Sequence, residues 1–122
     1  AWPSIVDLCA ISVYISGGRD AKQCLASAER FNHRTSTWEM LPNMSQRRSG
    51  ATAGVISNKL YICGGEDGHM VLNSVERFNP AGSTWEAVTP MLTERAGATS
   101  GVIGNKLHVC GGYAAGRTSL SS

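Results

Sequence analysis

Hydrophobic residues in this chain fall in short runs, and each run is bounded by glycine, proline, asparagine or serine. The clearest set covers 51–56, 59–63, 74–78 and 84–88. None of these runs shows the spacing of three or four residues that marks an amphipathic helix. The pattern therefore predicts an all-β chain in which four short strands, joined by turns, make one structural unit.

This unit recurs along the chain with a period of 47 residues. The double glycine at 64–65 has counterparts 47 residues before and 47 residues after it. Residues 48–65 and 95–112 are identical at 13 of 18 positions. A fixed period of this size is typical of repeat proteins, and four strands per repeat match one β-propeller blade.

The three repeats differ in completeness. Residues 45–91 hold a complete repeat, 1–44 a diverged or partial one, and 92–122 a truncated one, which gives about 2.6 blades. The first strand expected over residues 1–9 departs most from the pattern. Because a closed propeller has roughly four to eight blades, and repeats bury their cores against each other, we expect a segment of a longer propeller or a chain that self-associates.

Turn residues in the complete repeat have predicted conformations. Ser57 and Asn58 are expected to turn between the first and second strands. Gly64 and Gly65 end the second strand, where glycine permits positive φ and close approach of a neighbouring backbone. Residues 79–82 are expected to turn between the third and fourth strands, with the glycine of that segment supplying the tight bend.

Two further features of the complete repeat point to framework roles. The ring of Trp85 opens the fourth strand, where it is expected to fill the space between twisted blades. Glu76 and Arg77 recur one period earlier, and we interpret them as a structural ion pair or hydrogen-bond bracket rather than as reactive groups.

The order of these features resembles the kelch repeat: a double glycine after an apolar strand, a loop, SVERFNP, and a tryptophan 20 residues after the second glycine. More narrowly, RRSGATAGVISNKLYICGGEDG followed by LNSVERFNP resembles the propellers of kelch-like proteins, which pair a BTB domain with a kelch propeller. The resemblance implies four-stranded antiparallel blades. It also implies a parent protein that acts as substrate-recognition adaptor of a cullin-dependent ubiquitin ligase.

Binding is expected in the loops at one rim, because loops on a rigid scaffold are free to vary. In kelch-like propellers the residue after the double glycine commonly contacts the substrate degron, as do the Arg and Ser before the first strand's glycine. The positions that match in this chain are Arg19, Glu66 and Tyr113 for the first kind, and Arg48, Ser49 and Arg95 for the second.

Each candidate has a functional and a structural interpretation. Arg48 and Arg95 offer planar forks suited to carboxylate or phosphate groups, and Tyr113 offers an amphipathic anchor. In the alternative interpretation, the two arginines bond carbonyls of the neighbouring blade, Glu66 belongs to a solvated turn, and Tyr113 only packs on the surface. Arg19 is the most ambiguous position.

Charge and hydropathy narrow the range of partners. The chain has 11 basic and 9 acidic side chains, a net charge of +2, without a run of Lys or Arg. This balance steers nucleic acid only weakly, so no nucleic-acid partner is expected. The apolar run at 8–15 is too short to span a membrane and follows no basic leader, so no membrane partner is expected.

The four cysteines, at positions 9, 24, 63 and 110, form no Cys-x-x-Cys motif. Cys63 and Cys110 hold the same place before the double glycine in successive repeats, a position expected to be small and buried. We therefore predict free, reduced thiols without a structural metal. Reduced thiols fit an intracellular, cytoplasmic protein.

Catalysis is not expected. His33, His69 and His108 fall on a turn, a loop and a strand, and His108 is expected to pack in its strand. The chain has no nucleophile elbow and no phosphate-cradling loop. We predict a non-catalytic module without cofactors that binds a protein or peptide through its loop face. The alternatives are a propeller that binds actin or an actin-associated protein and, third, an oxidase-type propeller enzyme.

Overall fold

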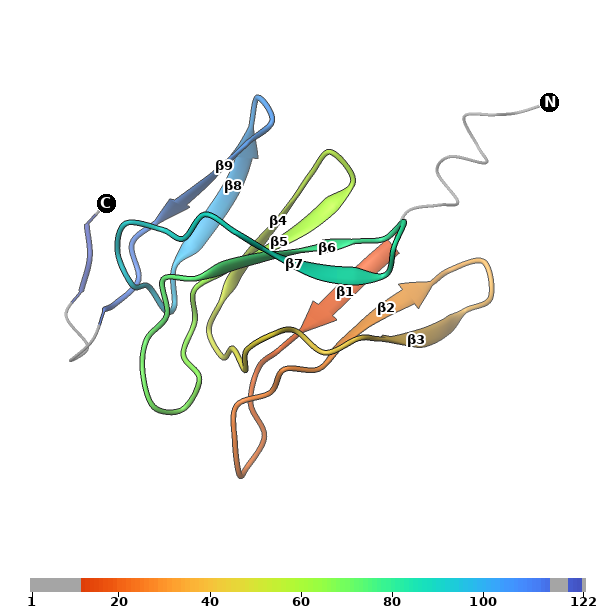
Figure 1. Ribbon diagram of the computed structural model, residues 1–122, viewed down its shortest axis with the longest axis horizontal. Helices are drawn as coiled ribbons and strands as arrows, with labels where there is room; N and C mark the ends of the chain where they lie inside the picture. The colour runs from red at the N-terminus through yellow and green to blue at the C-terminus, as the bar shows by residue number, and fades with distance from the viewer. Residues whose placement is uncertain (1–11, 115–118, 122) are drawn as a thin grey trace.

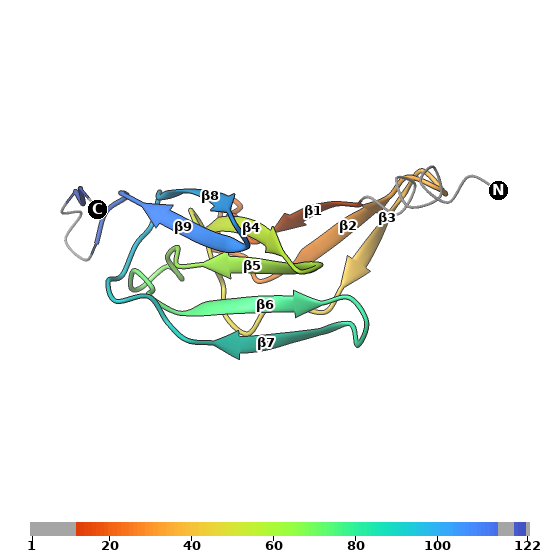
Figure 2. The ribbon, with the colours of Figure 1, turned by 90° about the horizontal axis from the view of Figure 1, so that it is seen from above.

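A computed structural model describes residues 12–114 and 119–121 of the chain. In these residues all regular elements are β-strands, arranged in three antiparallel sheets that follow one another in space as in sequence (Figures 1 and 2). The first strand expected over residues 1–9 lies outside the described residues. The strands are β1 (Ser12–Ser16), β2 (Ala28–Asn32), β3 (Thr37–Leu41), β4 (Thr52–Ile56), β5 (Lys59–Cys63), β6 (Val75–Asn79), β7 (Thr84–Val88), β8 (Thr99–Ile103) and β9 (Lys106–Cys110).

The middle sheet is a complete four-stranded blade with the order β4-β5-β6-β7. Its strands β5 and β7 have the predicted bounds, and β4 and β6 each begin one residue later than predicted. The flanking sheets show β1-β2-β3 and β8-β9. The predicted all-β fold of antiparallel blades is confirmed, and the sheets form part of a propeller.

The turns follow from residues that tolerate positive φ. Ser57 and Asn58 have φ values of 49° and 63°, the left-handed pair that matches the twist of a two-residue hairpin. In the β6–β7 turn the left-handed residue is Ser83, with φ of 52°, and not Gly82. The prediction that Gly82 supplies the bend is therefore wrong. The Asn79 side chain shapes this turn by accepting a bond from the Ala81 N–H at 3.1 Å.

The double glycine allows two blades to approach closely. Gly64 and Gly65 have φ values of 67° and 90°. A Cβ on Gly64 would collide with the carbonyl oxygen of Arg95 in the next repeat, and one on Gly65 would lie 2.9 Å from the carbonyl oxygen of Ser49. The predicted positive φ and close backbone approach are confirmed.

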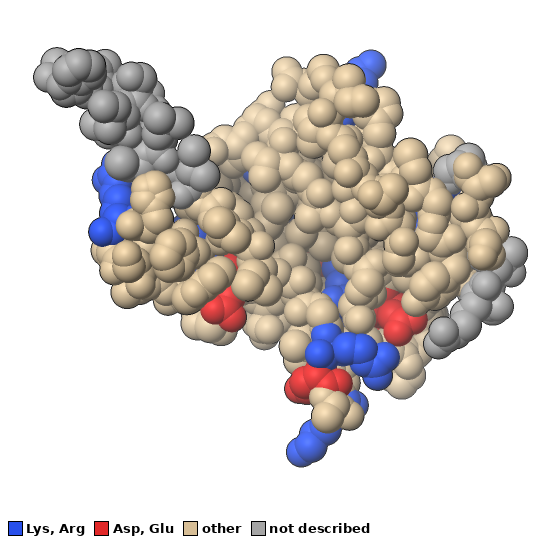
Figure 3. Space-filling view, turned by 180° about the vertical axis from the view of Figure 1, so that it is seen from behind, with Lys and Arg blue, Asp and Glu red and all other residues tan. Residues whose placement is uncertain are grey.

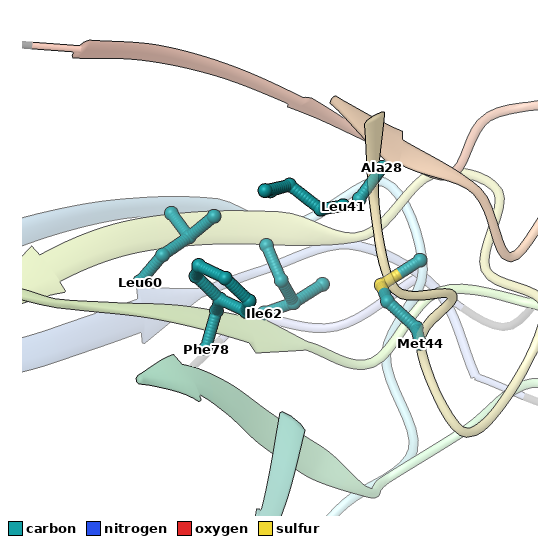
Figure 4. Packing of buried hydrophobic residues seen from close by; sticks show 6 residues of the cluster. All are labelled: Ala28, Leu41, Met44, Leu60, Ile62 and Phe78. Carbon is teal, nitrogen blue, oxygen red and sulfur yellow. The ribbon is translucent and has the colours of Figure 1, made fainter. Parts of the chain in front are cut away.

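The hydrophobic core lies between the first and second blades (Figure 4). Phe78 is fully buried, with its ring centroid 5.2 Å from that of Trp85 and 6.2 Å from that of Tyr14. The indole N–H of Trp85 donates to the carbonyl of Pro42 in the preceding repeat at 2.7 Å. The predicted interblade role of Trp85 is confirmed. The other members of the core cluster are Ala28, Leu41, Met44, Leu60 and Ile62.

Replacing Phe78 by alanine tests this interblade core. Because the Phe78 ring is fully buried, the Phe78→Ala change is expected to lower the free energy of unfolding by about 3–5 kcal/mol. The matched control is Phe31→Ala, one period earlier, where the ring is only half-buried. Urea denaturation should show a loss below about 2 kcal/mol for the control. Equal losses at the two positions would contradict the placement of the core.

Candidate functional site

Three loops that occupy equivalent places in the repeats carry the candidates that follow the double glycines, namely Arg19, Glu66 and Tyr113. Each loop is closed by an antiparallel bridge, which pairs Arg19 with Cys24, Glu66 with Val71, and Tyr113 with Ser119. Figure 1 shows the β1–β2 and β5–β6 loops projecting from the same side of the sheets.

Arg19, Glu66 and Tyr113 come together in one line across the three repeats, which we call the polar row. A guanidinium nitrogen of Arg19 lies 3.8 Å from Glu66 Oε1. The Tyr113 hydroxyl donates to Glu66 Oε2 at 3.3 Å. The Arg19 side chain is 62% exposed and that of Glu66 24% exposed. Figure 3 shows charged side chains gathered around the loops at the lower end of this view.

Backbone pairs hold the polar row in place. Ser49 and Glu66 exchange two N–H to carbonyl bonds of 2.8 Å. Ala96 and Tyr113 repeat this exchange at 2.9 and 2.8 Å. The residue that follows each repeat's arginine is thus paired with the residue that follows its double glycine. Ser49 therefore lies beside Glu66.

Arg48 lies below this surface, with 1% of its area exposed. One terminal nitrogen donates to the carbonyls of Gly64 at 2.9 Å and Ser74 at 3.0 Å, and Nε donates to Glu76 Oε2 at 3.0 Å. The other terminal nitrogen binds the side chains of Ser74 at 3.0 Å and Gln46 at 3.2 Å. Every nitrogen of the guanidinium is therefore bonded within the chain.

Glu76 is the buried partner of this arginine, also 1% exposed. Besides Arg48, its carboxylate accepts bonds from the Ser45 N–H at 2.9 Å and the Ser45 hydroxyl at 3.0 Å. A buried carboxylate is tolerated only when it is paired and hydrogen-bonded in this manner. We call Arg48 and Glu76, with the carbonyls of Gly64 and Ser74, the arginine clamp.

Glu76 and the adjacent Arg77 both have framework roles, but they do not pair with each other. Adjacent residues of a strand point to opposite faces of the sheet. Arg77 instead binds Glu86 at 3.0 Å and the Tyr61 hydroxyl at 3.2 Å. The hydrogen bond from Arg77 lowers the pKa of the Glu86 carboxyl. The structural interpretation therefore fits both residues, which hydrogen-bond separate partners, but the interpretation of the two neighbours as one ion pair is wrong.

The clamp arginine also joins two blades through its backbone. The Arg48 N–H donates to Leu25 at 2.9 Å, and its carbonyl accepts from the Gly18 N–H at 2.7 Å. Arg95 repeats this arrangement, since its carbonyl accepts from Gly65 at 2.8 Å and its side chain donates to the carbonyl of Gly111 at 2.8 Å. The framework alternative fits both arginines, but their side chains bond carbonyls of their own repeat, and only their backbone bonds reach the neighbouring blade. Arg48 has no exposed donor for a partner.

Two aspartates shape the loops, and we did not identify them as a pair from the sequence. Asp20 Oδ1 accepts the backbone N–H groups of residues 22 and 23, at 2.8 and 2.9 Å. Asp67 Oδ1 does the same for residues 69 and 70. These bonds lower the pKa of both carboxyls. Their 47-residue offset could have revealed them, and the third repeat has Ala114 at this place.

The third loop is one residue longer than the other two. Leu25 donates to Gly18 and Leu72 to Gly65, whereas Leu120 donates to Gly112, eight residues back. The same backbone hydrogen bond therefore closes all three loops, although the loops differ in sequence. Variation in loops on a constant framework is typical of a binding surface.

The reactive side chains outside the row are dispersed. Cys24, Cys63 and Cys110 are free thiols, as predicted. The expected burial is right for Cys63 but wrong for Cys110, which is exposed because β9 pairs only with β8 among the described strands. Cys9 lies outside the described residues. Burial raises the pKa of Cys63 to about 11, against the opposing effect of the nearby Arg48 charge.

His33, His69 and His108 are exposed, so the expectation that His108 packs in its strand is wrong. β9 pairs only with β8 within the described segments, which leaves its outer side uncovered. No group of three metal-ligating side chains occurs in residues 12–114 and 119–121. Within the same residues, no helix has the length and apolar character needed to cross a membrane.

The blades, the double glycines and the loops define a segment of a kelch-type β-propeller. The Kelch motif family matches residues 12–45 and 47–92, so the chain belongs to this family. A solved structure described as "Structure of YjhT" is similar, with a TM-score of 0.67 and 22% identity. The similarity covers 80% of this chain and 33% of that one, so this chain spans about a third of it. No curated protein matches the chain.

Removing the clamp arginine is expected to be costly. Arg48→Met leaves the buried Glu76 carboxylate without its counter-ion, which should lower the free energy of unfolding by about 3–5 kcal/mol. Arg47→Met is the matched control, because Arg47 is exposed, and it should change stability by no more than about 0.5 kcal/mol. Urea denaturation of both variants measures the difference. Similar small effects would mean that Arg48 is not a framework residue.

Thiol alkylation tests the burial of the cysteines. A raised pKa keeps the Cys63 thiol neutral in the folded chain, whereas the pKa of a thiol in the unfolded chain is about 8.5. The stability that depends on this neutral thiol is thus complete below that pH and declines as pH rises toward about 11. At pH 8, iodoacetamide should label Cys110 first, and Cys63 only after urea is added. Equal labelling rates in the folded chain would be inconsistent with this structure.

Proposed function

We propose that this chain is a non-catalytic interaction module that recognises a protein or peptide through the polar row. The observation that supports the proposal is that Arg19, Glu66 and Tyr113, at equivalent positions of three repeats, line up through contacts of 3.8 and 3.3 Å. The row presents a cation, an anion and an aromatic hydroxyl in fixed order. Such a row fits an extended peptide with an acidic group opposite Arg19 and a donor opposite Glu66.

The framework supports binding by limiting the entropy lost on association. The polar row stands on backbone pairs, and Asp20 and Asp67 hold two of its loops through their side-chain oxygens. A loop that is already ordered loses less conformational freedom when a partner binds. Arg48 and Arg95 contribute by positioning Ser49 and Ala96, which pair with the row.

We further propose that the parent protein is a substrate-recognition adaptor of a cullin-dependent ubiquitin ligase in the cytoplasm. Membership of the Kelch motif family supports an interaction role, and the resemblance to kelch-like propellers supports the adaptor role. In that arrangement a BTB domain of the parent binds the cullin and the propeller binds the substrate. Binding of actin is the alternative role for the same surface.

Substitutions in the polar row test recognition. A photo-crosslinking residue placed at position 22, an exposed place on the β1–β2 loop beside the polar row, should capture a defined set of proteins, and the same residue at position 34 is the control. Arg34 is an exposed residue on the β2–β3 turn. Glu66→Gln should weaken capture from position 22 by about tenfold, the loss of one good charged contact. Circular dichroism would confirm that the variant remains folded.

The outcomes separate the roles. Identical captures from positions 22 and 34, or no effect of the Glu66 change, would contradict recognition by the polar row. Copurification of a cullin with the full-length parent supports the adaptor role. Saturable cosedimentation of the propeller with filamentous actin, without a cullin, would replace the adaptor role with the cytoskeletal one.

A further inference from the structure

Neighbouring repeats carry different charges at equivalent positions of the loop rim, by which we mean the β1–β2 and β5–β6 loops and the linkers that lead into β4 and β8. At two pairs of positions the charge is reversed, and at a third pair a positive charge is lost: Arg19 and Glu66, Arg47 and Glu94, and Lys22 and His69. The members of each pair are 47 residues apart. All of them are exposed except Glu66, whose side chain is 24% exposed. The sign of the surface thus changes from one repeat to the next.

Backbone bonds gather these charges into two groups. The linker before β4 is joined to the β1–β2 loop, because Arg48 donates its N–H to Leu25 at 2.9 Å and accepts from Gly18 at 2.7 Å. The linker before β8 is joined to the β5–β6 loop in the same way by Arg95. The first group, the basic half of the rim, has Arg19, Lys22 and Arg47, and the second, the acidic half, has Glu66, Asp67 and Glu94.

The two halves remain opposite in sign when every charged residue is counted. Asp20 lies in the basic half, at the place that Asp67 holds in the acidic half. The basic half therefore has three basic and one acidic side chains, whereas the acidic half has three acidic ones and no exposed Lys or Arg. Arg48 and Arg95 do not belong to the rim surface, because their side chains donate to carbonyls at the ends of β5 and β9. Both signs gather at the lower end of Figure 3.

We propose that the peptide recognised by the polar row carries its acidic and basic residues in two separate blocks. The acidic block lies on the basic half of the rim and the basic block on the acidic half. This inference rests on the function proposed above and adds the order of charges in the partner. The halves meet where Arg19 lies 3.8 Å from Glu66, so the charge of the bound peptide changes sign at that point of the row.

Separated charges of this kind select a partner by orientation and by rate of association. A single exposed ion pair contributes little to affinity, so no one contact on the rim defines the partner. Complementary potentials spread over several residues speed association, and like charges placed opposite each other disfavour a wrong partner. A uniformly acidic peptide would be attracted by one half and repelled by the other. Only a peptide with two blocks of charge complements both halves.

A second copy of this chain is the competing occupant. A two-fold axis would bring the basic half of one rim onto the acidic half of the other. The polar row favours a peptide, because its three side chains follow one line, which an extended chain can track along its length. The loops of a second copy are already closed by their own backbone bonds. Exposed ion pairs alone also contribute too little to hold two folded chains together.

Selection from a phage-displayed library of random dodecapeptides on the immobilised 122-residue chain tests the order of charges. Enriched peptides should hold Asp and Glu in one block and Lys and Arg in another more often than peptides of the unselected library do. A fluorescein-labelled enriched peptide should then be compared with a peptide of the same composition in which the charges alternate. Fluorescence anisotropy should show about tenfold weaker binding of the alternating peptide, because like charges then meet on both halves.

A matched pair of protein variants tests the two halves. Arg47→Glu combined with Glu94→Arg keeps the net charge and exchanges one charge between the halves, at two exposed positions. This double variant should bind the enriched peptide about tenfold more weakly, because two attractive contacts become repulsive. Arg34→Glu is the control, since Arg34 is exposed on the β2–β3 turn, at the other end of β2 from the rim. It should change the affinity by no more than about twofold, the effect of net charge alone.

The outcomes distinguish this inference from the function on which it rests. If no peptide is enriched, both recognition by the polar row and the two blocks of charge are contradicted. Enriched peptides with charges of one sign or in mixed order, or binding that ignores the exchange of charges, would overturn the two blocks alone. So would a chain that sediments as a dimer and becomes monomeric in the double variant, because a second copy then occupies the rim.

Discussion

The ion pair between Arg48 and Glu76 is the constraint around which the middle blade is built. Both side chains are about 1% exposed, and they meet at 2.9 Å. Charges buried this deeply destabilise a fold unless each is paired and hydrogen-bonded. Here the arginine also bonds two carbonyls, and the glutamate accepts two bonds from Ser45. The pair thereby ties the segment just before β4 to strand β6. Through Ser45 it also holds the linker that leads into β4.

The same arginine connects the blade to its neighbour and to the candidate recognition surface. Its backbone bonds to Leu25 and Gly18 in the first repeat. The next residue, Ser49, pairs with Glu66 at the centre of the polar row. The buried Arg48 is thus followed directly by Ser49, which belongs to the candidate surface. The burial of Arg48 therefore fixes the position of Ser49. The ring of Phe78, in contact with those of Trp85 and Tyr14, fills another part of the space between the same two blades.

Features that depend on local chemistry could be predicted from the sequence. Strands β5 and β7, the turn at Ser57 and Asn58, and the positive φ of the double glycine all follow from residue types in a short window. The resemblance to kelch-like propellers singled out the residues that follow the double glycines, and these residues meet in the polar row because equivalent loops of neighbouring blades lie side by side.

The burial of Arg48 and its pairing with Glu76 could not be predicted, since they depend on residues that are distant in the sequence. Arg48 is buried against Glu76, which lies 28 residues further along the chain in β6, two strands away from β4. Within the sequence, Glu76 stands beside Arg77, which suggested the wrong pair. Ser83 in place of Gly82 shows the same limit on a smaller scale, because the Asn79 side chain determines how that turn closes.

A double-mutant cycle on Arg48 and Glu76 tests the clamp most directly. Arg48→Met, Glu76→Leu and the double variant would be compared with the original chain by urea denaturation. A cooperative buried pair predicts that the double variant is markedly more stable than the sum of the single changes implies, with a coupling energy in the range of about 0.5–3 kcal/mol measured for residues in contact. Additive effects, with no coupling energy, would contradict the central role of this ion pair.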